Sequence, residues 1–319
     1  MAIGADDGSD RAVNEGSLRL GIGIGKAAAH HGEILQGVFD GSDGRLHRGL
    51  VTLPCPIFGS TAAFWPRSGR DIATRPMGRE KASRAARLTL ERLQRPDIGG
   101  DLVIESTVPM GHGYGSSTSD VVATIRAVAS AARVILRPET IAALAVSAET
   151  ASDPLAFENL PILFAQRDGY MLELLGFAFP PLVIVGCNLE PTRPVDTVLT
   201  SPARYNSEEI EVFRVLKGLA KRAISDGDAQ LLGRVATASA KISQRHLPKP
   251  DFEALCAISL SAGADGLQVA HSGTLAGFLF DGASSTTRER AIEVVRQLKA
   301  RGHSQIITYE LGMDARSAR

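Results

Sequence analysis

The segment VPMGHGYGSSTSD, at residues 108–120, constrains the fold more than any other part of the chain. Its three alternating glycines stand directly before the hydroxyl side chains of Ser116, Ser117 and Thr118. Residues 101–108 alternate as a half-buried strand does, and residues 119–134 carry alanine and other apolar residues at helical spacing. The pattern therefore predicts a strand, a glycine-rich loop and a helix in succession.

A glycine-rich loop at the start of a helix is suited to binding phosphate. The N–H groups at a helix N-terminus are left unpaired and the helix dipole adds partial positive charge there, so an anion is held without a lysine. The alternative is an ordinary glycine turn in which Ser or Thr only caps the helix. We expect phosphate contact along residues 111–118.

Composition and charge exclude several classes of protein. The 319 residues are 44% hydrophobic and 22% charged, which predicts a globular protein of two lobes. Lys+Arg and Asp+Glu each number 35, and a net charge of zero argues against a nucleic-acid partner. Cys55, Cys187 and Cys256 have no metal-ligand spacing and are odd in number, which favours reduced thiols in the cytoplasm.

The sequence also argues against a membrane protein. No stretch approaches the roughly 20 apolar residues of a membrane span. Residues 1–16 are acidic and lack the apolar stretch of a signal peptide, so we expect a loose tail there. Small molecules are the expected partners.

The rest of the chain is predicted to mix strands and helices. Residues 18–24 predict an opening strand that leads into a loop at 26–37, and Pro54 and Pro56 are expected to separate two short strands. Further helices are expected at residues 79–94, 138–147, 208–224, 228–246, 252–262 and 288–300, and further strands at 182–187, 266–273, 275–280 and 305–310. The fold class is α+β, with a tail at 1–16, an N-terminal lobe at 17–179, a C-terminal lobe at 180–313 and a tail at 314–319.

The spacing of the glycine loop excludes two common phosphate-binding motifs. A Walker A loop needs lysine followed by Ser or Thr, but Lys26 is followed by Ala27, and no glycine run has the GxGxxG spacing of a dinucleotide site. The loop instead resembles the PxxxGxGSS(A/T) motif of the GHMP small-molecule kinases. By this resemblance the ATP phosphates are bound by Pro109, Gly111, Gly113, Tyr114, Gly115, Ser116, Ser117 and Thr118.

Two more segments resemble motifs of the same superfamily. Residues 31–37, HGEILQG, stand in place of its first motif, and residues 270–277, AHSGTLAG, in place of its third. Both look most like the L-threonine kinase branch associated with propanediol utilisation and cobalamin synthesis. The resemblance implies a GHMP kinase fold with an N-terminal lobe like ribosomal protein S5 domain 2 and a ferredoxin-like C-terminal lobe. It also implies ATP and Mg²⁺ in the cleft and a small hydroxy amino acid as substrate, and it leaves a homodimer open.

The resemblance further implies roles for individual side chains. Ser117 and Glu149 would ligate Mg²⁺, a cation that prefers oxygen. Asp153 would act on the acceptor hydroxyl as a general base or an orienting carboxylate, with Glu33 as a second catalytic carboxylate. Substrate contacts are expected from Glu33, Gln36, His271, Ser272 and Gly273.

The acidic string departs from the pattern of the threonine kinase branch. That branch has Glu-Pro-Thr-Asp, whereas Glu149 and Asp153 are separated here by one residue more, without the proline. Asp153 directly before Pro154 also fits a helix N-cap followed by proline at the first helical position. The sequence leaves the catalytic and the capping role open.

The other histidines receive a structural interpretation. His30, His47, His112, His246 and His303 lack ligand spacing and are expected at the surface or in loops, with no zinc site, while His31 would either reach a ligand or lie in a polar turn. The leading hypothesis is an ATP- and Mg²⁺-dependent kinase that converts L-threonine to O-phospho-L-threonine. Homoserine kinase activity is the nearest alternative, and a catalytically silent nucleotide or metabolite sensor on the same fold is an alternative of another class.

Overall fold

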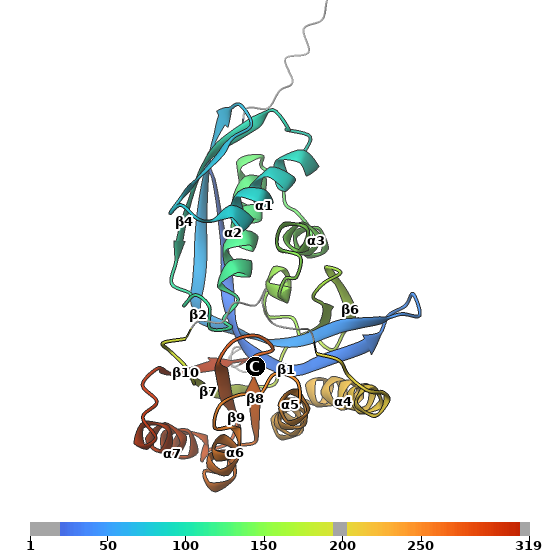
Figure 1. The fold of residues 1–319 in the computed structure, drawn as a ribbon, viewed down its shortest axis with the longest axis vertical. Coiled ribbons are helices and arrows are strands. Elements are labelled where there is room, and N and C mark those ends of the chain that lie inside the picture. Colours follow the sequence, from blue (N-terminus) through green and yellow to red (C-terminus); the bar gives the residue numbers. More distant parts are fainter. Residues whose placement is uncertain (1–19, 194–202, 313–319) are drawn as a thin grey trace, which may run out of the picture.

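The computed structural model describes residues 20–193 and 203–312, which form an α+β fold around one ten-stranded sheet (Figure 1). The longest path through the sheet runs in the order β10-β7-β9-β8-β1-β2-β4-β3. The tails expected at residues 1–16 and 314–319 lie outside the described residues. The expected α+β class is confirmed.

A long, bent antiparallel hairpin of β1 (Gly23–Asp40) and β2 (Leu46–Ser68) runs through the molecule (Figure 1). The prediction of a loop at residues 26–37 is wrong, and so is the prediction that Pro54 and Pro56 divide the second strand. The pairing shifts its register between Ala28 and Ala29 and twice more before Leu35. Such bulges tolerate proline and bend the strand without ending it.

The N-terminal part of the sheet is covered on one face by three helices. β4 (Ile98–Ser106) pairs with β2, and β3 (Ile72–Arg75) pairs with β4. The helices α1 (Glu80–Arg92), α2 (Ser116–Ala131) and α3 (Pro138–Glu149) pack over this sheet (Figure 1). All three helices were predicted from periodicity.

Close packing of α2 on β1 explains the alternating glycines of the first strand. A Cβ on Gly23 or Gly25 would lie 2.0 Å or 2.2 Å from a backbone oxygen of α2. Ile24, between the two glycines, and Ile22, just before β1, are both more than half exposed. The strand therefore presents its glycines, and not its isoleucines, to the helix.

The C-terminal part continues the same sheet. β7 (Leu182–Asn188), β8 (Gly266–Val269), β9 (Leu275–Asp281) and β10 (Ile306–Leu311) pair antiparallel, and Glu33 of β1 pairs with Val269 of β8. This part also contains the predicted helices α4 (Ser207–Asp226), α5 (Ala229–Ser243), α6 (Phe252–Ser261) and α7 (Thr287–Ala300) (Figure 1). The β1–β8 pairing brings the segments at residues 31–37 and 270–277 together.

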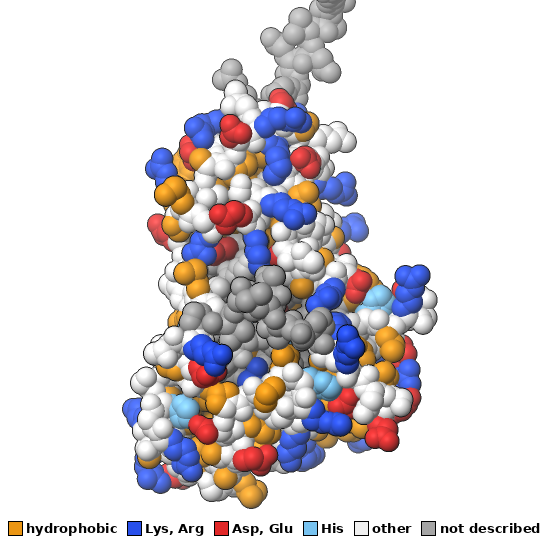
Figure 2. Space-filling model, viewed as in Figure 1, with side chains coloured by type: hydrophobic (Ala, Val, Ile, Leu, Met, Phe, Trp, Pro, Cys, Tyr) orange, Lys and Arg blue, Asp and Glu red, His pale blue; other side chains and the backbone are white. Residues whose placement is uncertain are grey.

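Three short elements complete the fold. The strands β5 (Ile162–Ala165) and β6 (Tyr170–Leu174) form a hairpin whose first strand pairs with β2, and a short 3₁₀ helix, η1 (Pro154–Phe157), follows α3. Like β3, both strands are too short to stand out by alternation, and the sequence did not predict them. Within the described residues, no helix is both long and apolar enough to cross a membrane. Figure 2 shows one face on which basic and acidic side chains are interspersed.

Candidate active site

The glycine loop between β4 and α2 depends on backbone conformations that favour glycine. Gly111, Gly113 and Gly115 have φ angles of 77°, 98° and 70°, and Gly115 is the N-cap of α2. Residues with a Cβ rarely adopt such angles. No side chain of the described residues caps the N–H groups at the start of α2, so these groups are available to bind an anion.

Tyr114 contributes only its backbone to this loop. Its side chain is buried against Phe58 and His31, and burial raises the pKa of its hydroxyl. The N–H of His30 donates to the Tyr114 carbonyl at 3.1 Å. The loop is thereby fixed to β1.

The third motif packs closely against the backbone of the glycine loop. A Cβ on Gly113 would lie 2.2 Å from the Ser272 carbonyl oxygen, and one on Gly273 would lie 2.3 Å from the His112 carbonyl oxygen. The N–H of Thr274 donates to that His112 oxygen at 3.0 Å. His112 lies in a loop, which is one of the two positions predicted for it, but its side chain is buried in this contact.

Two hydroxyls at the start of α2 meet the carboxylate at the end of α3. Ser117 Oγ donates to Glu149 Oε2 at 2.7 Å, and Thr118 Oγ1 donates to Glu149 Oε1 at 2.8 Å. Burial raises the pKa of Glu149, although both hydroxyls and the nearby Lys81 ammonium favour its ionised form. The structure therefore brings together the two side chains predicted to bind Mg²⁺.

Asp153 occupies the N-cap position of η1, but its side chain does not cap that helix. Its Oδ2 instead accepts a 3.3 Å hydrogen bond from Thr118 Oγ1 and lies 3.1 Å from Nε2 of His30. Thr150, with φ of 74°, ends α3 in a left-handed conformation and helps to accommodate the longer Glu149–Asp153 spacing. The side chain therefore contacts Thr118 and His30 and does not cap η1.

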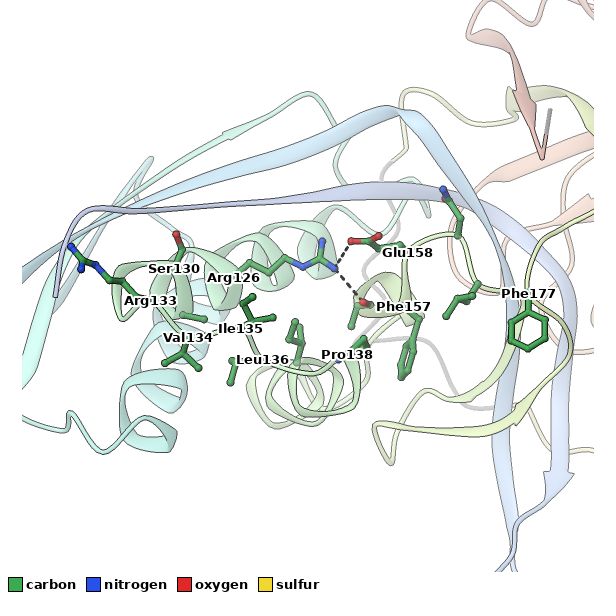
Figure 3. A pocket seen from close by; sticks show the side chains of 15 residues that line it. Arg126, Ser130, Arg133, Val134, Ile135, Leu136, Pro138, Phe157, Glu158 and Phe177 are labelled. Atoms are coloured by element: carbon green, nitrogen blue, oxygen red, sulfur yellow. Dashed lines mark hydrogen bonds and ion pairs between the residues drawn. The ribbon is translucent and has the colours of Figure 1, made fainter. Parts of the chain in front are cut away.

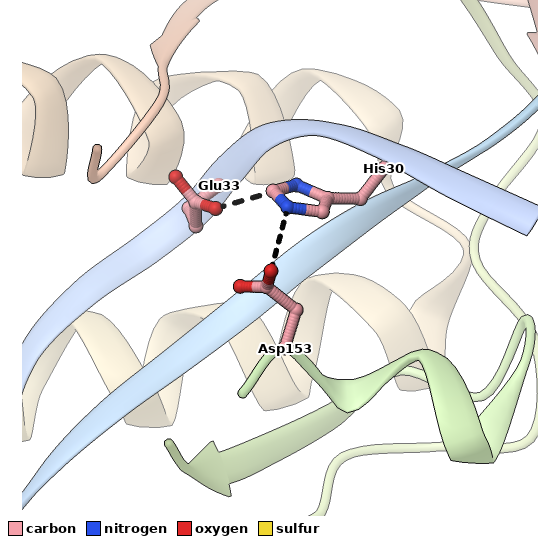
Figure 4. Close-up of side chains that lie close together, drawn as sticks. All are labelled: His30, Glu33 and Asp153. Carbon is pink, nitrogen blue, oxygen red and sulfur yellow. Dashed lines mark ion pairs between the residues drawn. The ribbon is translucent and has the colours of Figure 1, made fainter. Parts of the chain in front are cut away.

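The first and third motifs meet through Glu33. His271 donates its backbone N–H to Glu33 Oε2, and its Nδ1 lies 3.0 Å from Glu33 Oε1. His30 lies between Glu33 and Asp153 (Figure 4), with Nδ1 3.6 Å from Glu33 Oε1. Its side chain is only 1% exposed, so the prediction of a surface or loop histidine is wrong for His30.

The electrostatics of these four groups are coupled. Burial opposes the charged forms of His30 and His271, but the carboxylates of Asp153 and Glu33 outweigh it and raise the pKa values of both histidines. Burial likewise opposes ionisation of Asp153, yet the charge and hydrogen bond of His30 hold its pKa well below the usual range. The arrangement favours imidazolium beside carboxylate.

Two sets of side chains could hold a cation. Ligand atoms of His30, Glu33 and Asp153 lie within 4.8 Å of one another. However, the two ring nitrogens of His30 face different carboxylates (Figure 4), so one ion could not engage all three groups without movement of the ring. Ser117 and Glu149 offer only oxygen atoms, which suits Mg²⁺.

Gln36 and His31 lie beside the site but point into the core. Gln36 Nε2 donates to the Val269 carbonyl at 3.3 Å, and its Oε1 accepts from Ser243. His31 is fully buried, with Nδ1 2.7 Å from Gln268 Nε2. The structure does not bring either side chain to the Glu33–Asp153 cluster.

Lys249 is a buried cation that the sequence did not single out. Its Nζ donates to the Gly273 carbonyl at 2.8 Å, which supports the third motif. Burial lowers its pKa to about 8, against the opposing influence of Glu33 and Glu190. A lysine between two prolines outside any motif gives no sequence signal for such a position.

Two cavities differ in their relation to the site. One of about 860 Å³, lined by residues such as Arg133, Ile135 and Phe177, lies along α2 and α3 away from the glycine loop (Figure 3). The other, of about 580 Å³, is lined by His30 and Pro154 among others. The smaller cavity therefore borders His30 of the histidine–carboxylate cluster.

Burial of His31 predicts a specific pH dependence of stability. Burial lowers the pKa of His31 to about 3, so its imidazole stays neutral in the folded state. In the unfolded state the same side chain is protonated below about pH 6.5. The stabilisation of the folded state is complete above pH 6.5 and declines toward pH 3, by up to about 1.4 kcal/mol per pH unit. Urea unfolding from pH 7 to 4 should show the stability gap between wild type and His31→Asn closing as the pH falls. A constant gap would contradict a buried neutral imidazole.

Sequence and structural comparisons relate the chain to known proteins. The family model described as "GHMP kinases N terminal domain" matches residues 80–159, from α1 through the glycine loop to η1. This part of the chain is therefore similar to the N-terminal domain of the GHMP kinases. An L-threonine kinase of Citrobacter freundii is 29% identical over 279 residues, covering 82% of this chain and 87% of that protein. A homoserine kinase of Moorella thermoacetica is 27% identical over 213 residues, covering 65% of this chain and 71% of that protein.

The GHMP kinase fold extends over nearly all of the chain. The crystal structure of homoserine kinase from Cytophaga hutchinsonii superposes with a TM-score of 0.69 and 17% identity, covering 91% of this chain and 94% of that one. At this identity the likeness establishes the fold alone. The expected GHMP kinase fold is thus confirmed. Together with the kinase relatives, it indicates an ATP-dependent small-molecule kinase.

Proposed function

We propose that this GHMP kinase transfers the γ-phosphoryl group of ATP to the hydroxyl of L-threonine, giving O-phospho-L-threonine and ADP. The observation that carries the proposal is the convergence of the glycine loop, Glu149, Asp153 and the Glu33–His271 pair around one site. The 29% identity with an L-threonine kinase over most of both chains supports the choice of acceptor.

In this proposal, Asp153 receives the acceptor's proton. Its Oδ2 is engaged by Thr118 and His30, while no hydrogen bond from the described residues reaches Oδ1. In the proposed reaction the hydroxyl oxygen bonds to the γ-phosphorus, the bond from that phosphorus to the β–γ bridging oxygen breaks, and the hydroxyl proton passes to Asp153. Positioning and charge neutralisation supply most of the catalysis in such transfers.

The oxygen donors at the start of α2 fit a magnesium ion. Ser117 Oγ and Glu149 Oε2 would hold it, and the bound ion would neutralise charge on the phosphate oxygens. The free N–H groups of the loop would hold the phosphates themselves. Glu149 also orders Thr118 and Ser152 through hydrogen bonds, so it links the metal side of the site to Asp153.

Replacing Glu149 with glutamine is expected to raise the Mg²⁺ concentration for half-maximal activity at least about 10-fold, because a charged oxygen ligand is lost. Titrating Mg²⁺ at saturating ATP and threonine measures the change. Glu139→Gln, on the exposed first turn of α3, is the matched control and should leave the titration unchanged. An unchanged titration in Glu149→Gln would remove this residue from the metal site.

An enzyme-coupled assay of ADP formation tests the proposal, with L-threonine, L-serine, L-homoserine and galactose as acceptors. The masses of the products are determined in parallel. We expect the highest kcat/KM for L-threonine and a product heavier by one phosphoryl group. Preference for homoserine would support the second candidate, which the Moorella thermoacetica relative favours. Binding of ATP without turnover of any acceptor would instead indicate a nucleotide sensor.

A further inference from the structure

The contacts of His30 go beyond what the three motifs explain. Its side chain is 1% exposed and lies between two carboxylates, with Nε2 3.1 Å from Asp153 Oδ2 and Nδ1 3.6 Å from Glu33 Oε1 (Figure 4). Glu33 Oε1 is in turn 3.0 Å from Nδ1 of His271. The four side chains form an alternating series of carboxylate and imidazole: Asp153, His30, Glu33 and His271.

The backbone holds the His30 ring in this series. Its N–H is bonded to the Tyr114 carbonyl of the glycine loop. A Cβ on Gly115 would lie 2.4 Å from Cδ2 of the His30 ring and 3.0 Å from Asp153 Oδ2. The glycine at the N-cap of α2 therefore permits the ring and the carboxylate to approach the phosphate loop closely.

Burial leaves the ring dependent on its neighbours for charge balance. A buried imidazole and a buried carboxylate are each unfavourable alone when ionised, and they stabilise one another only in good geometry. Among the described residues, His30 Nδ1 has no hydrogen-bond partner, and Glu33 Oε1 lies 3.6 Å from it. A modest approach of Glu33 would complete the series.

We propose that His30 is a positioning residue that acts through Asp153: as an imidazolium it fixes the carboxylate ionised and aimed at the acceptor hydroxyl, and Glu33 with His271 keeps it in that state. This inference rests on the proposed role of Asp153 in phosphoryl transfer. His30 itself need not touch the substrate. The charged groups around His30 are Asp153 before η1, Glu33 on β1 and His271 after β8. Beyond them, Glu149 at the end of α3 interacts with Asp153, and Lys249 interacts with His271.

The proposal predicts opposite effects at the two ends of the pH–activity profile. With His30→Gln, Asp153 loses a neighbouring positive charge, so its pKa rises and the acidic limb of kcat/KM moves up by about 1 pH unit or more. In the wild type, deprotonation of His30 is expected to lower activity at alkaline pH, and this loss should be absent in His30→Gln. At neutral pH, kcat falls about 10²-fold because the carboxylate is no longer held in place.

His303→Gln is the control for the substitution itself, because His303 lies in the turn after α7. ATP-analogue binding and thermal unfolding of both variants are measured in parallel. A purely structural role for His30 would lower the unfolding temperature and leave the acidic limb in place. That outcome would overturn the proposal.

A second measurement does not depend on turnover. Nitrogen-15 NMR of the histidine rings should show the pKa of His30 falling toward or below the ordinary value in Asp153→Asn, since the stabilising carboxylate is neutralised. An unchanged His30 pKa would contradict the proposed pair. Absence of turnover in the wild type, with the NMR shift observed, would reject the proposed function while retaining the His30–Asp153 pair.

Discussion

Asp153→Asn is expected to lower kcat for the hydroxyl acceptor by about 10²–10⁴-fold, the usual contribution of a positioned acid or base. The amide retains the size of the carboxylate and can still accept the hydrogen bond from Thr118 Oγ1. It removes both the negative charge beside His30 and the proton acceptor at Oδ1. Steady-state kinetics with saturating ATP measure the change in kcat.

The KM for ATP and the affinity for an ATP analogue should change little in Asp153→Asn, because the glycine loop and Glu149 remain in place. Asp97→Asn, at an exposed position before β4, is the matched control. If Asp153→Asn retained wild-type kcat while losing thermal stability, the carboxylate would be structural. A variant that binds ATP but does not turn over supports an enzyme whose chemistry depends on this residue.

The glycine loop and its two companion segments could be predicted because local chemistry determines them. Gly111, Gly113 and Gly115 all adopt positive φ angles, and α2 begins directly after Gly115. The amphipathic helices were equally visible, since periodicity is a property of a short window of sequence. Ser117 and Glu149, which the resemblance assigned to one magnesium site, are hydrogen-bonded to each other, and their role as metal ligands stays a prediction.

The β1–β2 hairpin was not predictable in the same way. Lys26-Ala-Ala-Ala-His-His has weak strand propensity, and Pro54 and Pro56 normally end a strand. The pairing that overrides these local preferences is made with residues far along the chain, and bulges absorb the irregularities. Tertiary pairing of this kind leaves no signal within a window of sequence.

His30 shows the same limit at the level of the site. Histidine is intermediate in its tendency to be buried, so a histidine without ligand spacing gives no sequence signal of its environment. Its environment is created by Glu33 on the same strand, by Asp153 before η1 and by the close approach of Gly115. Only the assembled fold brings these groups together, so the sequence identified Glu33 and Asp153 but not the imidazole between them.

The close contact between the glycine loop and the third motif gives the other large expected effect. Gly113 has φ of 98°, and an added Cβ would lie 2.2 Å from the Ser272 carbonyl oxygen. Ala at such an angle costs roughly 1–2 kcal/mol before any contact is counted. Because the obstructing atom is backbone, the two loops must separate, which displaces the phosphate-binding N–H groups.

Gly113→Ala is therefore expected to destabilise the protein by at least roughly 1–2 kcal/mol and to lower kcat/KM for ATP by about 10²-fold. Gly218→Ala, on the exposed face of α4 with nothing within 4 Å of an added Cβ, is the control. It should stabilise the protein by about 0.5–1 kcal/mol, since alanine favours a helix interior over glycine. Denaturant unfolding should therefore show that Gly113→Ala is less stable than the wild type and that Gly218→Ala is more stable. ATP-dependent kinetics should show the loss of kcat/KM only in Gly113→Ala. If Gly113→Ala kept wild-type values in both measurements, the contact between the glycine loop and the third motif would not be required for ATP binding.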